Sequence, residues 1–209
     1  MGHVITLAQQ KGGSGKTTVA INLAVAFARQ GASVALVDTD PQGSMGRWFM
    51  TRRDAGREDL DFSTASAWGV PYECDKLSRT HDFVIIDTPP KVDSDLRPAL
   101  RESDLVLVPV AASQVDVWAT EAVLELAARE RRPAMVLLNR AKAGARVTAA
   151  VAEALAGLDA AQAETVLGNR VAYAEALGLG QGVLERPKGP WSAEVEALAQ
   201  EILAALDGE

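Results

Sequence analysis

Short apolar runs recur along the chain and alternate with longer stretches of helical periodicity. Residues 62–67 and 165–167 are weaker strand candidates, and helical patterns cover residues 16–29 and lie around 115–130, 144–157 and 191–206. Five runs are apolar at successive positions, as in strands buried on both faces: 4–8, 34–38, 83–87, 105–110 and 134–139. The alternation predicts an α/β fold, a mostly parallel twisted sheet with helices on both faces.

The size and composition of the chain predict one domain, residues 1–209, because no repeat, low-complexity tract or linker interrupts the pattern. Apolar residues make up 48% of the sequence and charged residues 23%, which is typical of a soluble globular protein. Cys74 is the only cysteine, so an internal disulfide is excluded. The sequence also lacks a signal-peptide pattern and an apolar run of the roughly 18 residues that a bilayer requires. We therefore expect a cytoplasmic protein.

The net charge of −7 argues against a surface that is basic throughout. However, residues 129–188 hold nine Lys and Arg residues against six acidic ones, so this segment carries +3 and the remainder −10. From charge alone, a solvated surface and a binding surface are equally good interpretations of this basic segment.

Polar residues follow the predicted strands at the points where parallel strands end. Lys11 to Thr17 follow the first strand, Asp38 and Asp40 end the second, and Asp87 and Asn139 end two others. Ligands bind at the carboxyl ends of the strands in such sheets. We therefore expect these residues to converge on one site.

The glycine-rich turn at residues 12–17 lies between a predicted strand and a predicted helix. Its glycines let backbone N–H groups face a phosphate, Lys16 can reach the β- and γ-phosphates, and the Thr17 hydroxyl can ligate Mg²⁺. The sequence departs from the common G-x-x-x-x-G-K-[ST] form, because Gln10 occupies the first glycine position and Lys11 follows it. The pattern predicts an ATP site.

The three aspartates complete this predicted chemistry. Asp87 ends an apolar run at the place where a carboxylate holds magnesium, usually through water. Asp38 and Asp40 are two residues apart, so on an extended chain both face the same side. One can then face the metal while the other orients the attacking water. Pro41 and Gly43 suggest a loop that moves with the γ-phosphate.

Together these motifs resemble the ParA/MinD superfamily of deviant Walker A ATPases, and most closely the small partition ATPases of the ParF type. Lys11 matches the signature lysine of that family. The family's switch I is similar to residues 38–43, its Walker B and switch II to residues 87–90, and its C-terminal region to residues 170–185. The segment 113–116 resembles another family motif, with Gln114 where a proline is usual.

The resemblance implies that ATP and Mg²⁺ hold two subunits face to face in a homodimer. It implies catalytic roles for Lys11, which reaches the partner's phosphates, for Lys16, and for Asp40, which positions the water. It implies magnesium binding by Thr17, Asp38 and Asp87. The nucleotide-binding residues that it implies are Lys11, Gly12, Gly13, Ser14, Gly15, Lys16, Thr17, Thr18 and, at the adenine, Asn139; for Asn139 a turn-capping role is an equally good interpretation.

The family's ATP-bound dimer coats DNA without sequence preference, and a ParB-like or other adaptor protein on the cargo stimulates hydrolysis. The resemblance therefore implies a nucleoid-associated ATP state that partitions or positions DNA or a large protein cargo. The candidate DNA contacts in the basic segment are Arg140, Lys142, Arg146, Arg170 and Lys188.

Two alternative functions are built on the same scaffold. A membrane-bound division regulator of the MinD type needs a basic amphipathic C-terminal helix, and no Lys or Arg follows Lys188. A metabolic enzyme, either an ATP-dependent ligase or a reductase, remains open, although Cys74 alone does not supply the ligands of an iron–sulfur cluster.

Overall fold

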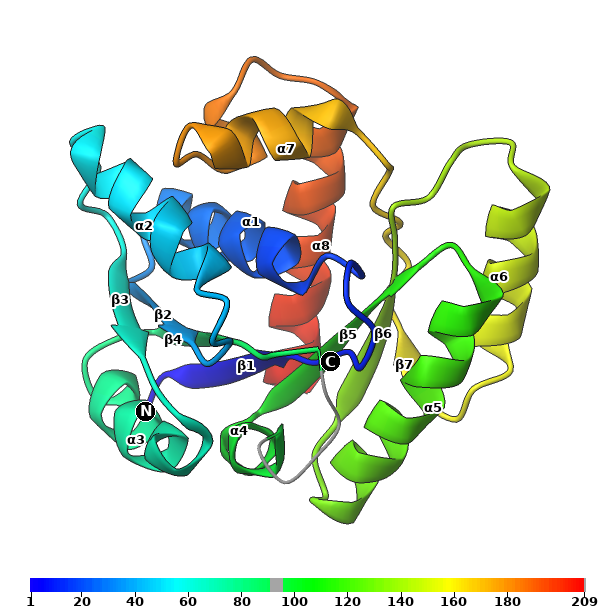
Figure 1. Cartoon of the computed structure of the whole chain (residues 1–209), viewed down its shortest axis with the longest axis horizontal. Coiled ribbons are helices and arrows are strands. Elements are labelled where there is room, and N and C mark those ends of the chain that lie inside the picture. Colours follow the sequence, from blue (N-terminus) through cyan, green and yellow to red (C-terminus); the bar gives the residue numbers. More distant parts are fainter. Residues whose placement is uncertain (91–95, 209) are drawn as a thin grey trace.

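The fold is organised around one parallel sheet, and the computed structural model describes residues 1–90 and 96–208. The strands lie in the order β3-β2-β4-β1-β5-β6-β7, and every neighbouring pair is parallel (Figure 1). The strands are β1 (His3–Leu7), β2 (Val34–Asp38), β3 (Asp61–Thr64), β4 (Phe83–Asp87), β5 (Leu105–Ala111), β6 (Ala134–Asn139) and β7 (Ala161–Gln162). The predicted parallel α/β sheet is confirmed.

Helices cover both faces of the sheet, as predicted (Figure 1). One layer contains α1 (Lys16–Arg29), α2 (Ser44–Asp54), α7 (Val171–Gly178) and α8 (Pro190–Asp207). The other contains α3 (Val70–Ser78), α4 (Leu96–Glu102), α5 (Gln114–Arg129) and α6 (Arg146–Ala156). Two 3₁₀ turns complete the elements: η1 (Ala67–Gly69) lies between β3 and α3, and η2 (Val183–Glu185) lies between α7 and α8. In the part of the chain that the structure describes, no helix is long and apolar enough to cross a membrane.

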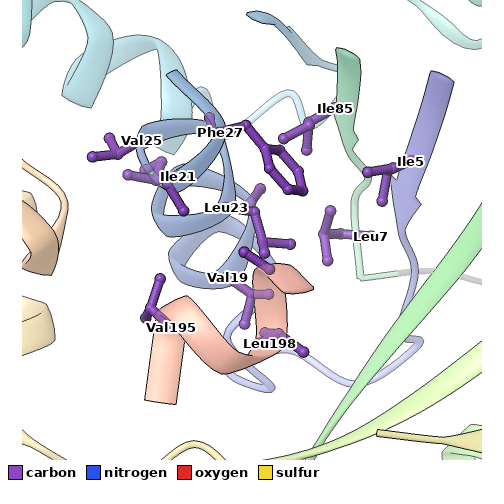
Figure 2. Packing of buried hydrophobic residues seen from close by; sticks show 14 of the residues in the cluster. Ile5, Leu7, Val19, Ile21, Leu23, Val25, Phe27, Ile85, Val195 and Leu198 are labelled. Atoms are coloured by element: carbon purple, nitrogen blue, oxygen red, sulfur yellow. The ribbon is translucent and has the colours of Figure 1, made fainter. Parts of the chain in front are cut away.

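The central strands are apolar at successive positions because each of their faces has its own core. Leu7 and Ile85 pack with α1 and α8 in the larger core (Figure 2). Val84 and Val106 face the helices of the opposite layer. Full burial of one such side chain contributes about 1.5–3 kcal/mol, so helix α1, with ten buried residues, is fixed firmly against the sheet.

The strand predicted at 165–167 is wrong. The last strand is β7, at Ala161–Gln162, and it pairs with β6. The Thr165 backbone N–H donates instead to the Glu201 carboxylate of α8, at 2.8 Å. Only Leu167 meets the sheet edge, where its N–H donates to the Leu138 carbonyl. A side chain therefore takes the hydrogen bond that a strand would have needed.

The sheet brings the polar strand ends to one edge. Strand β1 lies between β4 and β5, and Leu7 is level with Asp87 of β4. Asp38 of β2 is also level with Asp87. The segment after β1 therefore emerges beside two carboxylates, and the predicted convergence of the loop with these aspartates is confirmed.

Candidate functional site

The loop between β1 and α1 is anchored on both sides by buried amide side chains. Gln9 donates through Nε2 to Thr120 Oγ1 of α5, at 3.0 Å. Asn139 donates through Nδ2 to the Ser14 carbonyl, at 2.8 Å, and its Oδ1 accepts the Arg140 N–H. These bonds hold the loop against the sheet edge. The structure thus gives Asn139 a loop-holding role, and its contact with adenine remains a prediction.

Gly15 is required where the loop becomes helix α1. Its φ of 95° lies in the left-handed region, and a Cβ at this position would stand 2.4 Å from Asn139 Nδ2. Helix α1 begins at Lys16 without a side-chain cap and without an acidic residue in its first turn. The first N–H groups of the helix and its dipole are therefore available to an anion.

Lys16 is buried at the base of this loop. Its Nζ donates to the Gln9 carbonyl at 3.1 Å, so the side chain folds back under the loop. Burial lowers the pKa of Lys16, and the Asp87 and Asp40 carboxylates oppose that shift. A buried ammonium with one carbonyl partner can bind an anion and thereby recover the electrostatic stabilisation that burial removes.

Asp87 and Thr17 form the best candidate magnesium site. Thr17 Oγ1 donates to Asp87 Oδ2 at 2.5 Å, while Asp87 Oδ1 is buried and, among the described residues, has no hydrogen-bond partner. Burial raises the pKa of Asp87 to about 7, against the opposing effects of the Thr17 hydrogen bond and of Lys16. An unpartnered carboxylate oxygen next to a hydroxyl suits Mg²⁺, which prefers oxygen ligands and retains water.

No group of three or more His, Cys, Asp or Glu residues within 1–90 and 96–208 could hold a metal ion by itself. This agrees with a site that a nucleotide and water would complete, because Mg²⁺ in such sites takes one or two protein ligands and oxygens of the phosphates.

Asp38 and Asp40 shape the loop between β2 and α2. Asp38 is buried, and its two oxygens accept the backbone N–H groups of Asp40 and Gly46 at 3.0 and 3.1 Å. Burial raises the pKa of Asp38. Asp40 is half-buried and accepts the N–H of Gln42 at 2.9 Å. The structure therefore gives Asp38 a role in holding this loop, while its support of magnesium stays a prediction.

Lys11 points away from Lys16. Its Nζ donates to Asp116 Oδ2 at 2.6 Å and to Ser113 Oγ at 3.3 Å, at the start of α5. Asp116 is buried, whereas Lys11 is 40% exposed. Lys11 thus lies at the rim, at the start of α5, a helix on which the side chains of Val115 and Trp118 are exposed.

Two adjoining pockets surround the phosphate loop. The first, of about 660 Å³, holds the loop glycines with Lys16, Thr17 and Asp40. The second, of about 540 Å³, lies between α1 and the segment 167–174 and is lined by Asn139. Thr18 lines both pockets. The two pockets also share Arg140 and Leu177, so they offer neighbouring places for a phosphate chain and for a larger attached group.

The five predicted DNA contacts have different surroundings, although Lys142, Arg146 and Arg170 line one pocket of about 950 Å³. Lys142 is exposed on the loop before α6, Arg146 is exposed at the first position of α6, and Lys188 is exposed before α8. Arg170 forms an ion pair with Glu194 of α8, so its charge is already neutralised within the chain. Arg140 lines both pockets around the phosphate loop.

Two residues of the site were not among the site residues predicted from the sequence. Arg47 lines the phosphate pocket from α2, and Asp116 holds Lys11. No motif marks Arg47, and its only signal is its position in the helix that follows the Asp40 loop. Asp116 stands in the resembled segment 113–116, but only the fold shows that it lies beside Lys11.

A family model described as the CobQ/CobB/MinD/ParA nucleotide binding domain matches residues 5–183. The maintenance of carboxysome distribution protein A of Halothiobacillus neapolitanus is 30% identical over 211 residues, which cover 95% of each chain. The fold is similar to that of a putative plasmid partition protein from Borrelia burgdorferi B31 bound to AMPPNP, with a TM-score of 0.83, 20% identity and coverage of 98% of this chain and 100% of that one. It is also similar to septum site-determining protein MinD of Pyrococcus horikoshii OT3 complexed with Mg-ADP, with a TM-score of 0.82, 19% identity and coverage of 97% and 96%.

Proposed function

Because the chain belongs to the CobQ/CobB/MinD/ParA nucleotide-binding family, we propose that it is an ATPase whose ATP-bound homodimer positions DNA or a large protein cargo in the cytoplasm. The observation that carries the proposal is the opposite placement of two lysines in one loop. Lys16 lies under the loop, beside Asp87, whereas Lys11 lies at the rim. Lys16 would bind the nucleotide of its own chain, whereas Lys11 would contact the nucleotide of a second subunit.

The residues under the loop would hold the nucleotide and its metal. Lys16 binds the β- and γ-phosphates, and Thr17 and Asp87 hold Mg²⁺ with support from Asp38. When bound, Mg²⁺ neutralises the charge on the phosphates and orients them. Asp40 orients the attacking water from the loop between β2 and α2. The positions of Lys16 and Asp40 on one pocket wall support these roles.

Lys11 reaches the phosphates of the partner subunit. Its bonds to Asp116 and Ser113 keep it outside its own pocket, at the start of α5, a helix with two exposed apolar side chains, Val115 and Trp118. Such an apolar rim around a charge is typical of a surface that a second subunit covers. The dimer thus depends on ATP, because the partner's phosphates replace Asp116 as the ligand of Lys11.

The cargo side of the mechanism rests on exposed positive charge. Lys142, Arg146 and Lys188 form no ion pair with any residue of 1–90 or 96–208, so their charges are available to DNA phosphates. Dimerisation would join two such surfaces and raise the effective concentration of the second contact. An adaptor on the cargo then stimulates hydrolysis and releases the DNA. The carboxysome-distribution and plasmid-partition proteins among the relatives favour this function over a metabolic enzyme.

The test compares the parent with Asp40→Ala. With ATP and Mg²⁺, Asp40→Ala should bind nucleotide normally, hydrolyse it at least about tenfold more slowly, and accumulate as a dimer, since a positioned base typically contributes about 10²- to 10⁴-fold. Light scattering gives the dimer fraction, and phosphate release gives the rate. Asp54→Ala, at the far end of α2, is the control. A parent that neither binds ATP nor dimerises would contradict the proposed function.

A further inference from the structure

Two arginines that belong to none of the sequence motifs line the phosphate pocket from separate elements. Arg47 comes from α2 and Arg140 from the end of β6. In Figure 1, α2 and α6, which follows Arg140, stand on opposite sides of α1. Both arginines are exposed, and neither forms an ion pair within residues 1–90 and 96–208. Cationic groups gathered without a partner around a concave site are suited to a polyanion.

The helix that carries Arg47 is fixed in place. Trp48 Nε1 donates to the Gln181 carbonyl at 3.2 Å. Arg52 is fully buried, where it pairs with Asp59 and Glu185 and donates to the Gly180 carbonyl at 3.0 Å. The two residues pin α2 to the segment that follows α7. Arg47 therefore projects from a rigid support into the pocket, so little order has to be imposed on its backbone when a ligand binds.

Arg140 is held close to the start of α1. Its φ of 55° lies in the left-handed region, which is unfavourable for a non-glycine residue. Asn139 Oδ1 accepts its N–H at 2.8 Å and stabilises this conformation. Arg140 Nε lies 3.7 Å from the position that a Cβ on Gly15 would occupy. The strained backbone therefore holds a guanidinium beside the helix N-terminus, where an anion is favoured.

We propose that Arg47 and Arg140 clamp the polyphosphate of the bound nucleotide from its two ends, within one subunit. The proposal rests on the proposed function, since it requires a nucleotide at the phosphate loop. Arg47 and Asp40 line the same pocket. Because the proposed function puts Asp40 at the terminal phosphate, Arg47 would bind that phosphate. Arg140 lines both pockets together with Thr18, which places it where the phosphates continue toward the attached sugar and base.

The different positions of the two arginines give them different selectivities. Arg47 contacts a group that ATP has and ADP lacks, so it favours the triphosphate. Arg140 contacts phosphates that both nucleotides share, so it strengthens the binding of both. Arg140 would then be a nucleotide contact at the start of the loop that carries Lys142 and leads to Arg146, the first residue of α6.

The experiment measures the affinity of the full chain for a non-hydrolysable ATP analogue and for ADP, each with Mg²⁺, by isothermal titration at a concentration where light scattering reports monomer. Arg47→Ala should weaken binding of the analogue about tenfold and of ADP less than about twofold, because a charge-assisted hydrogen bond contributes ~1.5–3 kcal/mol. Arg140→Ala should weaken both by a similar factor, about five- to tenfold.

Two arginines serve as matched controls. Arg53→Ala removes an exposed arginine of the same helix α2, outside both pockets. Arg131→Ala removes an exposed arginine with the same left-handed backbone, at φ 56°, also outside both pockets. Both should bind the two nucleotides as the parent does. Arg47→Lys and Arg140→Lys, which keep the charge, should recover part of the affinity and guard against a folding defect in the alanine variants.

Several results would overturn the clamp. Parent-like affinity in both Arg47→Ala and Arg140→Ala would rule out the clamp. If the parent binds ATP in the same experiment and Lys16→Ala does not, the proposed function is unaffected. Equal losses for ATP analogue and ADP in Arg47→Ala would remove its assignment to the terminal phosphate. Loss of DNA retention in Arg140→Ala with unchanged nucleotide affinity would return Arg140 to the DNA surface. Failure of the parent to bind either nucleotide would contradict the proposed function itself.

Discussion

The phosphate site and the basic segment at residues 129–188 both depend on lysine and arginine side chains, but the fold surrounds these side chains differently. Lys16 is buried and bonded to the Gln9 carbonyl, with two carboxylates nearby. Lys142 and Arg146 are exposed and have no ion-pair partner in the described part of the chain. A buried charge has its role fixed by its neighbours, whereas an exposed charge acquires one only from a partner. The roles of residues in the phosphate site can therefore be assigned with more detail than those of residues in the basic segment.

The largest expected effect is at Lys16. Lys16→Ala removes the buried ammonium under the loop and should weaken ATP binding by about 100-fold or more, because charged hydrogen bonds in a partly buried site contribute several kcal/mol together. Isothermal titration with ATP and Mg²⁺ measures the change. Lys76→Ala, on the surface of α3, is the matched control and should bind as the parent does. An affinity within twofold of the parent would refute the assignment of the phosphate site.

The second effect concerns the dimer. Lys11→Ala should leave nucleotide binding by the monomer within about threefold of the parent and abolish the ATP-dependent dimer, because Lys11 lies outside its own pocket. Asp116→Asn should act in the opposite direction: without the carboxylate, Lys11 is released more readily and the dimer forms at lower protein concentration. Light scattering with a non-hydrolysable analogue measures both. A dimer that persists in Lys11→Ala would show that this lysine does not bridge the subunits.

The third effect separates stability from function at Asp87. The buried carboxylate of Asp87 destabilises the parent, because one of its oxygens has no hydrogen-bond partner among the described residues. In the absence of nucleotide, Asp87→Asn should therefore be more stable than the parent by about 1–3 kcal/mol. The same substitution should abolish magnesium-dependent ATP binding. Urea unfolding without nucleotide gives the stability. Equal or lower stability of the variant at neutral pH would contradict this view of the site.

The sign of the pH dependence follows from the same burial. The pKa of Asp87 is raised from 3.8 to about 7, so the folded state keeps a proton that the unfolded state has released. The free energy of unfolding of the parent should therefore fall as the pH rises between these values. Asp87→Asn has no carboxylate that titrates in this range, so the difference in unfolding free energy between variant and parent should grow from pH 3.8 to about 7. Above that pH the difference should stay constant.

The smallest effects are expected on the basic segment. Lys142→Ala and Arg146→Ala should each weaken DNA retention by the ATP dimer only a few-fold, equally for unrelated duplexes, and should reduce the slope of log affinity against log salt by about 0.9 per lost contact. Arg170→Ala should instead lower stability, because it leaves Glu194 without its partner. Retention on two unrelated duplexes at two salt concentrations measures the first effect. Unchanged retention and slope in both variants would remove this loop from the DNA surface.

The comparison also explains which sequence predictions succeeded. The strands and the phosphate loop could be predicted because each depends on neighbours in the chain: apolar residues in succession, or glycines that allow a left-handed turn at Gly15. The strand at 165–167 could not, because Glu201, 36 residues away, takes the Thr165 N–H. The charge of Arg170 could be counted from the sequence, but its neutralisation by Glu194 could not.

The sequence by itself determined the parallel α/β fold, the loop from Gly12 to Thr17, and the convergence of Asp38 and Asp87 at one sheet edge. These follow from local periodicity and from the rule that parallel strands end together. Only the tertiary structure decided that Lys11 rests on Asp116 and that Arg47 and Arg140 meet at one pocket. These pairings join residues roughly 90 to 105 positions apart, and the loops and helices between them leave no periodic trace in the sequence.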